Sequence, residues 1–424
     1  MFIGGFHVGR GFGLRPACAQ AYNIAWGTDE PLLCSPGAFP GGAWTPNRGW
    51  GDDVVFLGTV ERSHMTLLST YNVTVAQPAV RPVYKGQHGL FRPECIRENV
   101  ARVCGLVEQA VRDFDSKLVV FPEFCLQGYA VKRSTIDWER AGLLMPGAET
   151  AALAAVARST GATIAGAAVE RIPDFPGRYF MSAFVIGPDG IMPEDQLKLV
   201  YRKLYGLSAK TRPGDIHDTF VATYGRQSLF PVIDTPLGKI GCAIAGDVAM
   251  PEMVRALAMR GAELVLVPGA AIHESGYPAP SGSSSQRLDP NSSAVRRVRA
   301  WENLTYLAYA NIGPFIDDDG TVGQERIPSE IVDYLGRVKA RSKTSGETLV
   351  TARVDMMALR RYRADVRFNY LAHLQPALHA AEYAGAELCP LNGFANHSPA
   401  DEQDMVDLIA KGWTNVVKSG RFND

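Results

Sequence analysis

The sequence predicts an α/β fold in which helices cover sheets. Short apolar runs such as residues 117–122 and 263–268 have the length and composition of buried strands. Between such runs, residues 93–113 repeat apolar side chains at helical spacing. Strands that alternate with helices are typical of α/β proteins. The chain has 424 residues, of which 46% are hydrophobic, so it is long enough to bury a full core.

The other elements follow from the same criteria. We expect further strands at residues 71–77, 163–169, 180–186, 229–234, 239–244, 305–312, 330–334 and 347–354. We expect further helices at 149–159, 251–260, 293–303 and from 356 onward, and a terminal helix at 401–411 that ends before Gly412. Residues 197–215 are expected to be mostly loop.

The first part of the chain differs in composition from the rest. Residues 1–58 hold 12 of the 42 glycines and three of the six tryptophans, without helical periodicity. Because disordered segments are poor in aromatic residues, we expect an irregular arm that wraps another surface. The predicted organisation is an N-terminal arm at 1–69, a main domain at 70–370, and a C-terminal tail at 371–424 with the terminal helix.

Charge and cysteine content exclude several classes of function. The 43 Lys and Arg residues balance the 44 Asp and Glu residues, which argues against nucleic acid or an anionic membrane as the main partner. No apolar run reaches the roughly 20 residues that span a bilayer. The seven cysteines are scattered and lack zinc-binding spacing. We therefore predict a cytoplasmic protein without a metal or cofactor.

Residues 238–261 are predicted to form a strand, a sharp turn and a helix. Gly246 and Asp247 are turn residues, and Pro251 suits the first turn of a helix. Ala245 then lies at the strand end and faces a helix N-terminus, where the helix dipole and free N–H groups stabilise an anion. Such an elbow favours a nucleophile. Alanine has no nucleophilic atom, so the reactive group is missing.

Two charged residues elsewhere are candidate catalytic groups. Glu123 follows a buried strand between Phe121 and Phe124, where apolar surroundings disfavour a charged carboxylate and suit it to general acid–base chemistry. It could equally cap a turn or pair with an arginine. Lys203 could stabilise an oxyanion or pair with Glu123. Its structural alternative is a solvated surface lysine.

Five motifs in order resemble the nitrilase superfamily of carbon–nitrogen hydrolases. Three of them are Pro-Glu at 122–123, Tyr-Arg-Lys at 201–203 and Gly-Lys-Ile-Gly-x-x-Ile-x-Gly-Asp-x-x-x-Pro-Glu at 238–252. Residues 255–268 are similar to the family's stretch after its nucleophile. Residues 299–311 are similar to its Arg-Ala-x-Glu-Asn…Ala-Asn element. The resemblance covers about residues 70–370.

The resemblance implies a four-layer α-β-β-α sandwich and a Glu-Lys-Cys catalytic set. The glutamate is Glu123, the lysine is Lys203, and the cysteine position is Ala245. Cys242 points to the opposite face of its strand, and nothing places Cys125 on the elbow. The alanine is either a deliberate replacement that traps uncleaved substrate or the mark of a natural pseudoenzyme. The intact Glu and Lys favour the deliberate replacement.

Further residues complete the predicted pocket. The backbone N–H of Gly246 is expected to help hold the oxyanion, and Tyr129, Ala270 and His273 are candidate substrate contacts. His273 has an alternative role as an ordinary loop residue. Residues 204–214 lack the second glutamate of many family members, which leaves the substrate subclass open.

The resemblance also implies a homodimer or higher homo-oligomer. Its two-fold interface would use the helices at 251–260 and 293–303. The second helix carries the Arg296–Arg299 cluster, for which salt bridges or a subunit contact are expected rather than nucleic acid.

The predicted function is hydrolysis of a small amide through a cysteine thioester in the native form, with this chain inactivated at Ala245. A nitrilase acting on a nitrile is the alternative within the class, and Gly246-Asp247 gives the amidase a slight preference. A binding or scaffold pseudoenzyme and an acyltransferase are the alternatives from other classes.

Overall fold

The computed structural model describes residues 67–85, 89–129, 133–189, 197–205, 211–271, 292–317, 320–322, 327–386, 388–420 and residue 422. Residues 1–66 of the predicted arm lie outside these ranges, so the arm stays a prediction. Within the described part of the chain, no helix combines the length and the hydrophobicity needed to cross a membrane.

Two six-stranded sheets form the centre of the domain. The first has the order β14-β1-β2-β3-β4-β5, and the second has the order β13-β12-β9-β8-β7-β6. In each sheet one strand, β2 or β8, is parallel to both of its neighbours, and the other three pairings are antiparallel. The strands of the first sheet are β1 (Thr70–Gln77), β2 (Ser116–Val120), β3 (Thr163–Glu170), β4 (Phe180–Ile186), β5 (Leu197–Arg202) and β14 (Thr348–Asp355). Those of the second are β6 (Val232–Thr235), β7 (Gly238–Cys242), β8 (Leu264–Pro268), β9 (Tyr306–Ala310), β12 (Glu330–Val332) and β13 (Val338–Arg341).

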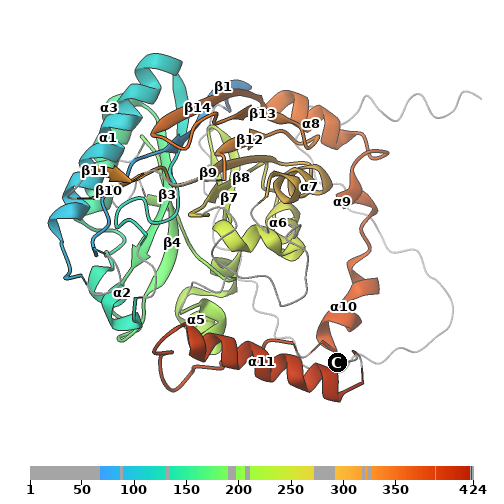
Figure 1. Ribbon diagram of the computed structural model, residues 1–424. Helices are drawn as coiled ribbons and strands as arrows, with labels where there is room; N and C mark the ends of the chain where they lie inside the picture. The colour runs from blue at the N-terminus through green and yellow to red at the C-terminus, as the bar shows by residue number, and fades with distance from the viewer. Residues whose placement is uncertain are drawn as a thin grey trace, which may run out of the picture. The chain divides into compact units, whose positions relative to one another are not determined.

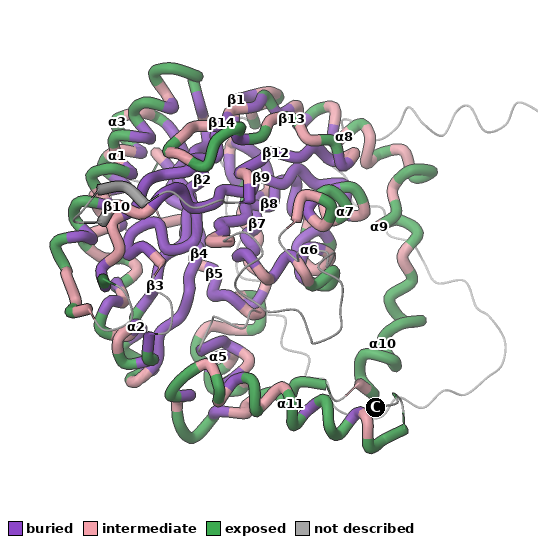
Figure 2. Tube along the Cα trace, viewed as in Figure 1, coloured by how far each residue is buried: buried purple, intermediate pink, exposed green. Residues whose placement is uncertain are grey.

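Helices cover the outer face of each sheet (Figure 1). Helices α1 (Glu94–Phe114) and α3 (Ala148–Thr160) lie on the first sheet, and α6 (Pro251–Met259) and α7 (Ser293–Asn303) lie on the second. On α1 the buried Val103, Leu106, Val107 and Ala110 fall on one face at helical spacing. Strands β3 and β4 are buried along their whole length, as Figure 2 shows in purple. The α/β class and the four-layer sandwich are confirmed.

The remaining elements lie outside the two sheets and the four helices that cover them. They are α2 (Thr135–Ala141), α5 (His217–Tyr224), α8 (Met356–Ala364), α9 (Tyr370–His373), α10 (Pro376–Ala384), α11 (Glu402–Lys418), the 3-10 turns η1 (Pro213–Ile216), η2 (Arg226–Leu229) and η3 (Ala245–Ala249), and the hairpin β10 (Phe315–Asp317) with β11 (Gly320–Val322).

Two expectations about these elements are wrong. The expected loop at 197–215 begins with strand β5, which pairs with β4 at the sheet edge. Leu197, Leu199 and Tyr201 alternate with Lys198 and Arg202, so the sequence does carry a period-two strand pattern, but over only six residues. The terminal helix continues through Gly412 to Lys418. The carbonyl of Leu388 packs directly against Gly412, so glycine at this position permits close packing and does not end the helix.

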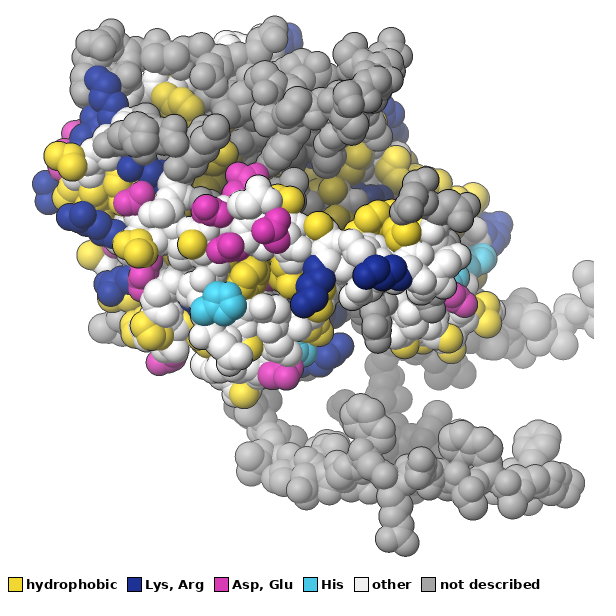
Figure 3. All heavy atoms as spheres, turned by 60° about the horizontal axis from the view of Figure 1, so that its bottom comes forward, with side chains coloured by type: hydrophobic (Ala, Val, Ile, Leu, Met, Phe, Trp, Pro, Cys, Tyr) yellow, Lys and Arg dark blue, Asp and Glu magenta, His cyan; other side chains and the backbone are white. Residues whose placement is uncertain are grey.

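The C-terminal segment packs on the main domain. Met405 and Val416 of α11 are buried. The guanidinium of Arg178 donates hydrogen bonds to the carbonyls of Phe394 (2.5 Å) and His397 (2.8 Å). Figure 3 looks onto the face that carries α5 and α11, where basic and acidic side chains both occur among hydrophobic ones.

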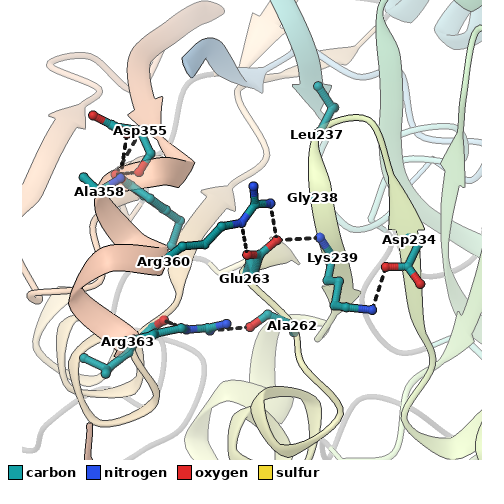
Figure 4. Close-up of polar contacts among 12 residues, drawn as sticks. Asp234, Leu237, Gly238, Lys239, Ala262, Glu263, Asp355, Ala358, Arg360 and Arg363 are labelled. Atoms are coloured by element: carbon teal, nitrogen blue, oxygen red, sulfur yellow. Dashed lines mark hydrogen bonds and ion pairs between the residues drawn. The ribbon is translucent and has the colours of Figure 1, made fainter. Parts of the chain in front are cut away.

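Helix α8 is joined to the second sheet by two arginines (Figure 4). Arg360 binds Glu263 through two hydrogen bonds of 2.6 and 2.9 Å, and the backbone N–H of Lys239 donates to the same carboxylate at 3.0 Å. Arg363 donates to the carbonyl of Ala262 at 2.6 Å. Burial acts to raise the pKa of Glu263, but the hydrogen bonds from Arg360 and Lys239 hold this pKa below its ordinary value.

Candidate active site

Glu123 lies in a tight turn directly after β2. The turn requires a left-handed backbone at Phe124, whose φ is 59°. The backbone N–H of Glu123 donates to the carbonyl of Gly269 at 3.2 Å, so the turn bridges the end of β2 in one sheet and the end of β8 in the other. The residue is only 4% exposed. A carboxylate buried to this degree needs a partner to remain charged.

That partner is Lys203, which directly follows β5. Its backbone N–H donates to the carbonyl of Met181 on β4 at 2.9 Å, which extends the strand pairing to this residue. Its ammonium group donates to Oε1 of Glu123 at 2.7 Å, and the residue is 3% exposed. An ammonium has three donors. Among the described residues Glu123 takes one of them, so donors remain for a bound oxygen.

The predicted elbow lies at the end of β7. Ala245 has a φ of 43°, which places a non-glycine residue in the left-handed region at a cost of about 1–2 kcal/mol. The 3-10 turn η3 begins at this residue, and α6 begins at Pro251. Gly246 is half-buried at the start of η3, where the first N–H groups of a helix have no intrahelical acceptor. The strand, turn and helix follow one another as the sequence predicts, with η3 between the strand and α6.

Asp247 joins the elbow to the strand of Lys203. Its carboxylate accepts hydrogen bonds from the N–H of Ile244 (2.7 Å), the hydroxyl of Tyr201 (2.7 Å) and the N–H of Tyr205 (2.8 Å). Burial raises the pKa of Asp247 to about 6, although Lys203 and these hydrogen bonds act to lower it. The sequence identified Asp247 only as a turn residue. Its burial depends on contacts across 42 to 46 residues, which no local pattern reports.

Helix α7 supports the elbow from outside. Arg299 donates to the carbonyls of Val248 and Ala249 at 3.0 Å each. In the same helix Arg296 forms a buried ion pair with Glu330 at 2.7 Å. Arg297 donates to the carbonyl of Gly336 at 2.7 Å, so all three arginines of the basic cluster form intramolecular polar contacts.

The two cysteines nearest the site in sequence are buried and unreactive. Cys125 donates to the carbonyl of Ala167 at 3.4 Å, and Cys242 lies in β7. Burial raises the pKa of each thiol to about 12. A thiol with a raised pKa forms little thiolate at neutral pH, so the structure does not favour either cysteine as a nucleophile.

The remaining predicted pocket residues have different positions. Tyr129 is half-buried, and its ring lies 5.2 Å from that of Phe124 in the turn of Glu123. Ala270 is half-buried directly after Gly269. His273 lies outside the described residues.

A cavity of about 350 Å³ lies between the loop before β4 and the C-terminal segment. Arg178 and His397 form part of its lining, and none of the predicted site residues lines it.

This geometry can be compared with known proteins. The carbon–nitrogen hydrolase family matches residues 73–364, and the chain belongs to this family. It is 27% identical to the omega-amidase NIT2 of Bos taurus over 272 residues, which cover 63% of this chain and 87% of that protein. It is 31% identical to a hydrolase in the pqqF 5′ region of Pseudomonas protegens over 224 residues, which cover 52% of this chain and 66% of that protein.

Solved structures show the same fold. The carbon–nitrogen hydrolase from Helicobacter pylori G27 aligns with a TM-score of 0.55 and 21% identity, and the alignment covers 74% of this chain and 98% of that one. A cysteine-to-alanine mutant of the Nesterenkonia AN1 amidase from the nitrilase superfamily aligns with a TM-score of 0.52 and 21% identity, covering 75% of this chain and 99% of that one.

Proposed function

We propose that Glu123, Lys203 and position 245 form the active site of an amidase-type carbon–nitrogen hydrolase whose nucleophile position holds alanine. One observation carries the proposal: the buried Glu123–Lys203 pair, joined at 2.7 Å and linked through Asp247 to an elbow with a left-handed residue at 245. Buried ionisable pairs beside an anion-stabilising turn are typical of catalytic sites. Family relatives named as amidases support an amide substrate.

In the form with cysteine at position 245, the reaction has two halves. Glu123 accepts the thiol proton, and the thiolate attacks the carbonyl carbon of the amide. The ammonium of Lys203 and the N–H of Gly246 bind the resulting oxyanion. Its collapse breaks the carbon–nitrogen bond, and Glu123 returns the proton to the leaving ammonia or amine. Glu123 then deprotonates a water molecule that attacks the thioester, which releases the acid and restores the thiol.

The chain with Ala245 lacks the atom that starts this sequence. It retains the groups proposed to bind the amide oxygen, so we expect it to bind the substrate and leave it intact. Deliberate replacement and natural loss of the cysteine leave the same residual site. Tyr129, Ala270 and His273 stay proposed substrate contacts.

The test restores the thiol by Ala245→Cys and measures ammonia release from a panel of amides, nitriles and carbamoyl compounds. We expect release from an amide, with an acyl adduct on residue 245 detected by mass spectrometry. The matched control is Ala249→Cys, which puts a thiol in the same turn away from the elbow and is expected to be inactive. Turnover of nitriles alone would select the nitrilase alternative. A folded Ala245→Cys protein without turnover and without an adduct would contradict the proposal.

We also propose that α6 and α7 form a contact between two copies of the chain. Met259 and Trp301 on these helices are 57% and 43% exposed, although the ring of Trp301 packs at 5.1 Å on Tyr370 of the same chain. Helices α6 and α7 pack on each other, and exposed apolar side chains on neighbouring helices are suited to a contact with another copy. Light scattering should give the mass of a dimer or larger assembly, and Trp301→Glu should reduce it. A monomeric parent protein would contradict this proposal. A cytoplasmic location stays a prediction.

A further inference from the structure

Three donors around Asp247 come from the two segments that the proposed chemistry must align. The N–H of Ile244 belongs to the residue directly before position 245. The hydroxyl of Tyr201 and the N–H of Tyr205 lie two residues before and two residues after Lys203. The same phenol oxygen of Tyr201 also accepts a hydrogen bond from the N–H of Leu204 at 3.2 Å. The backbone on both sides of Lys203 is thus tied to the elbow through one carboxylate.

The chemistry of this contact requires a carboxylate. Three donors converge on two oxygens, and both oxygens are used as acceptors. A charged aspartate offers acceptors only, whereas asparagine would turn an NH₂ group toward a donor. Asp247 has an exposed fraction of 0%, and a charge buried so completely is stable only when it is hydrogen-bonded and near an opposite charge. Lys203 supplies that opposite charge.

We propose that Asp247 is a positioning residue that fixes the ammonium of Lys203 relative to position 245. This inference rests on the proposed function, because the position of Lys203 relative to residue 245 affects a reaction only if both residues take part in it. Asp247 itself touches neither the substrate nor the reacting atoms. It acts through the backbone that carries Lys203 and through the turn that carries position 245.

The contact should respond to acid. The groups that face Asp247 are the phenol of Tyr201, the Lys203 ammonium with its partner Glu123, and Tyr205 with the nearby Glu252. Arg299 binds two carbonyls of the same turn from α7. Burial raises the pKa of the Asp247 carboxyl to about 6. Below that pH the protonated carboxyl gains a donor in a site that already has three, so at least one hydrogen bond is lost.

The test uses the reactivity of a thiol at position 245 and needs no substrate. The rate of alkylation of residue 245 by iodoacetamide is measured by peptide mass spectrometry between pH 5 and 9 in Ala245→Cys. A fixed ammonium nearby favours the thiolate and raises this rate. In the Ala245→Cys protein we expect the plot of alkylation rate against pH to have an inflection near pH 6. Adding Asp247→Asn should remove that inflection and slow alkylation at pH 7.5 on the order of tenfold, since tenfold corresponds to one unit in the thiol pKa.

Two controls keep the test decisive. Asp234→Asn changes an exposed carboxylate that pairs with Lys239, so it should leave the profile unchanged. Tyr201→Phe retains the carboxylate of Asp247 and removes one of its hydrogen-bond donors. It replaces Asp247→Asn in the test if that variant does not fold. It should also slow the alkylation of residue 245, by a smaller factor than Asp247→Asn. A folded Asp247→Asn protein, or a folded Tyr201→Phe protein in its place, with the parent's pH profile would overturn the inference. If the alkylation rates behave as expected but the Ala245→Cys protein hydrolyses no amide, the proposed function is contradicted and the positioning role of Asp247 is not.

Discussion

Two buried carboxylates in this molecule bind cations from distant parts of the chain in different ways. Glu263 accepts hydrogen bonds from Nε and Nη2 of Arg360 and from the backbone N–H of Lys239 (Figure 4). Glu123 receives one hydrogen bond from Lys203 among the described residues. The side chains of the second pair are 5% and 3% exposed, against 9% and 28% for Glu263 and Arg360.

The difference indicates what each pair does. A planar guanidinium that binds both carboxylate oxygens fixes geometry and leaves little capacity for another ligand. A compact ammonium with unused donors can bind a developing negative charge. The Glu263–Arg360 pair joins α8 to the segment between α6 and β8, so it stabilises the fold. The segment that carries Lys203 contacts the elbow through Asp247, and we propose that the Glu123–Lys203 pair binds the substrate there.

The largest expected effect comes from Lys203→Met in the Ala245→Cys protein. Removing the ammonium takes away an oxyanion donor and leaves the buried Glu123 without its cation. We expect ammonia release to fall on the order of 10²–10³-fold. Lys198→Met, in strand β5 just before Lys203, changes a lysine that is 28% exposed; it is the control and should retain the rate of the Ala245→Cys protein. Equal rates of ammonia release from Lys203→Met and Lys198→Met would contradict a catalytic role for the Glu123–Lys203 pair.

Arg360→Ala should affect stability instead of chemistry. It leaves Glu263 buried without its cation, so the free energy of unfolding in urea should fall by about 3 kcal/mol. The turnover of folded Ala245→Cys molecules should stay unchanged. Arg367→Ala removes an exposed partner of Asp365 and should leave the unfolding curve in place. An unfolding midpoint for Arg360→Ala that matches this control would contradict the structural role.

A smaller effect should appear in the pH dependence of stability. The pKa of Glu263 is lowered in the folded protein, so its contribution to stability is fully present above its unfolded pKa of about 4.3. The contribution is lost as the pH falls through the lower folded value. The difference in unfolding free energy between the parent and Glu263→Gln should therefore be constant from pH 6 to 7 and shrink below pH 4. If the difference in unfolding free energy grew below pH 4, the pKa of Glu263 would be raised in the folded protein, which would contradict this prediction.

The sequence predicted the fold well where patterns are local. Strand β4 and helix α7 have the predicted bounds, because apolar spacing and flanking turn residues define them. Strand β5 has the alternation of a strand in Leu197, Leu199 and Tyr201, but it spans only six residues, and its pairing with β4 is what defines it. The helix beyond Gly412 was missed because the reason for that glycine is the approach of the Leu388 carbonyl from another segment.

For the candidate site, too, the residues that local motifs mark were predicted, and the residue that depends on long-range contacts was not. Motif order pointed to Glu123, Lys203 and Ala245, and the resemblance to a family related them. The role of Asp247 was not predictable, because two of its three donors, Tyr201 and Tyr205, lie 46 and 42 residues before it in the sequence. Local sequence reports which residue types are present. Burial and convergence of polar groups require the packed sheets.

The most direct measurement compares two substitutions in the Ala245→Cys protein, with turnover expressed per folded molecule. Glu123→Gln removes the proposed base and should lower ammonia release by about 10²–10⁴-fold while the protein stays folded. Glu263→Gln should lower the melting temperature and leave turnover per folded molecule unchanged. Full turnover in Glu123→Gln, or an equal loss in both variants, would contradict the assignment of Glu123 and Lys203 to the chemistry.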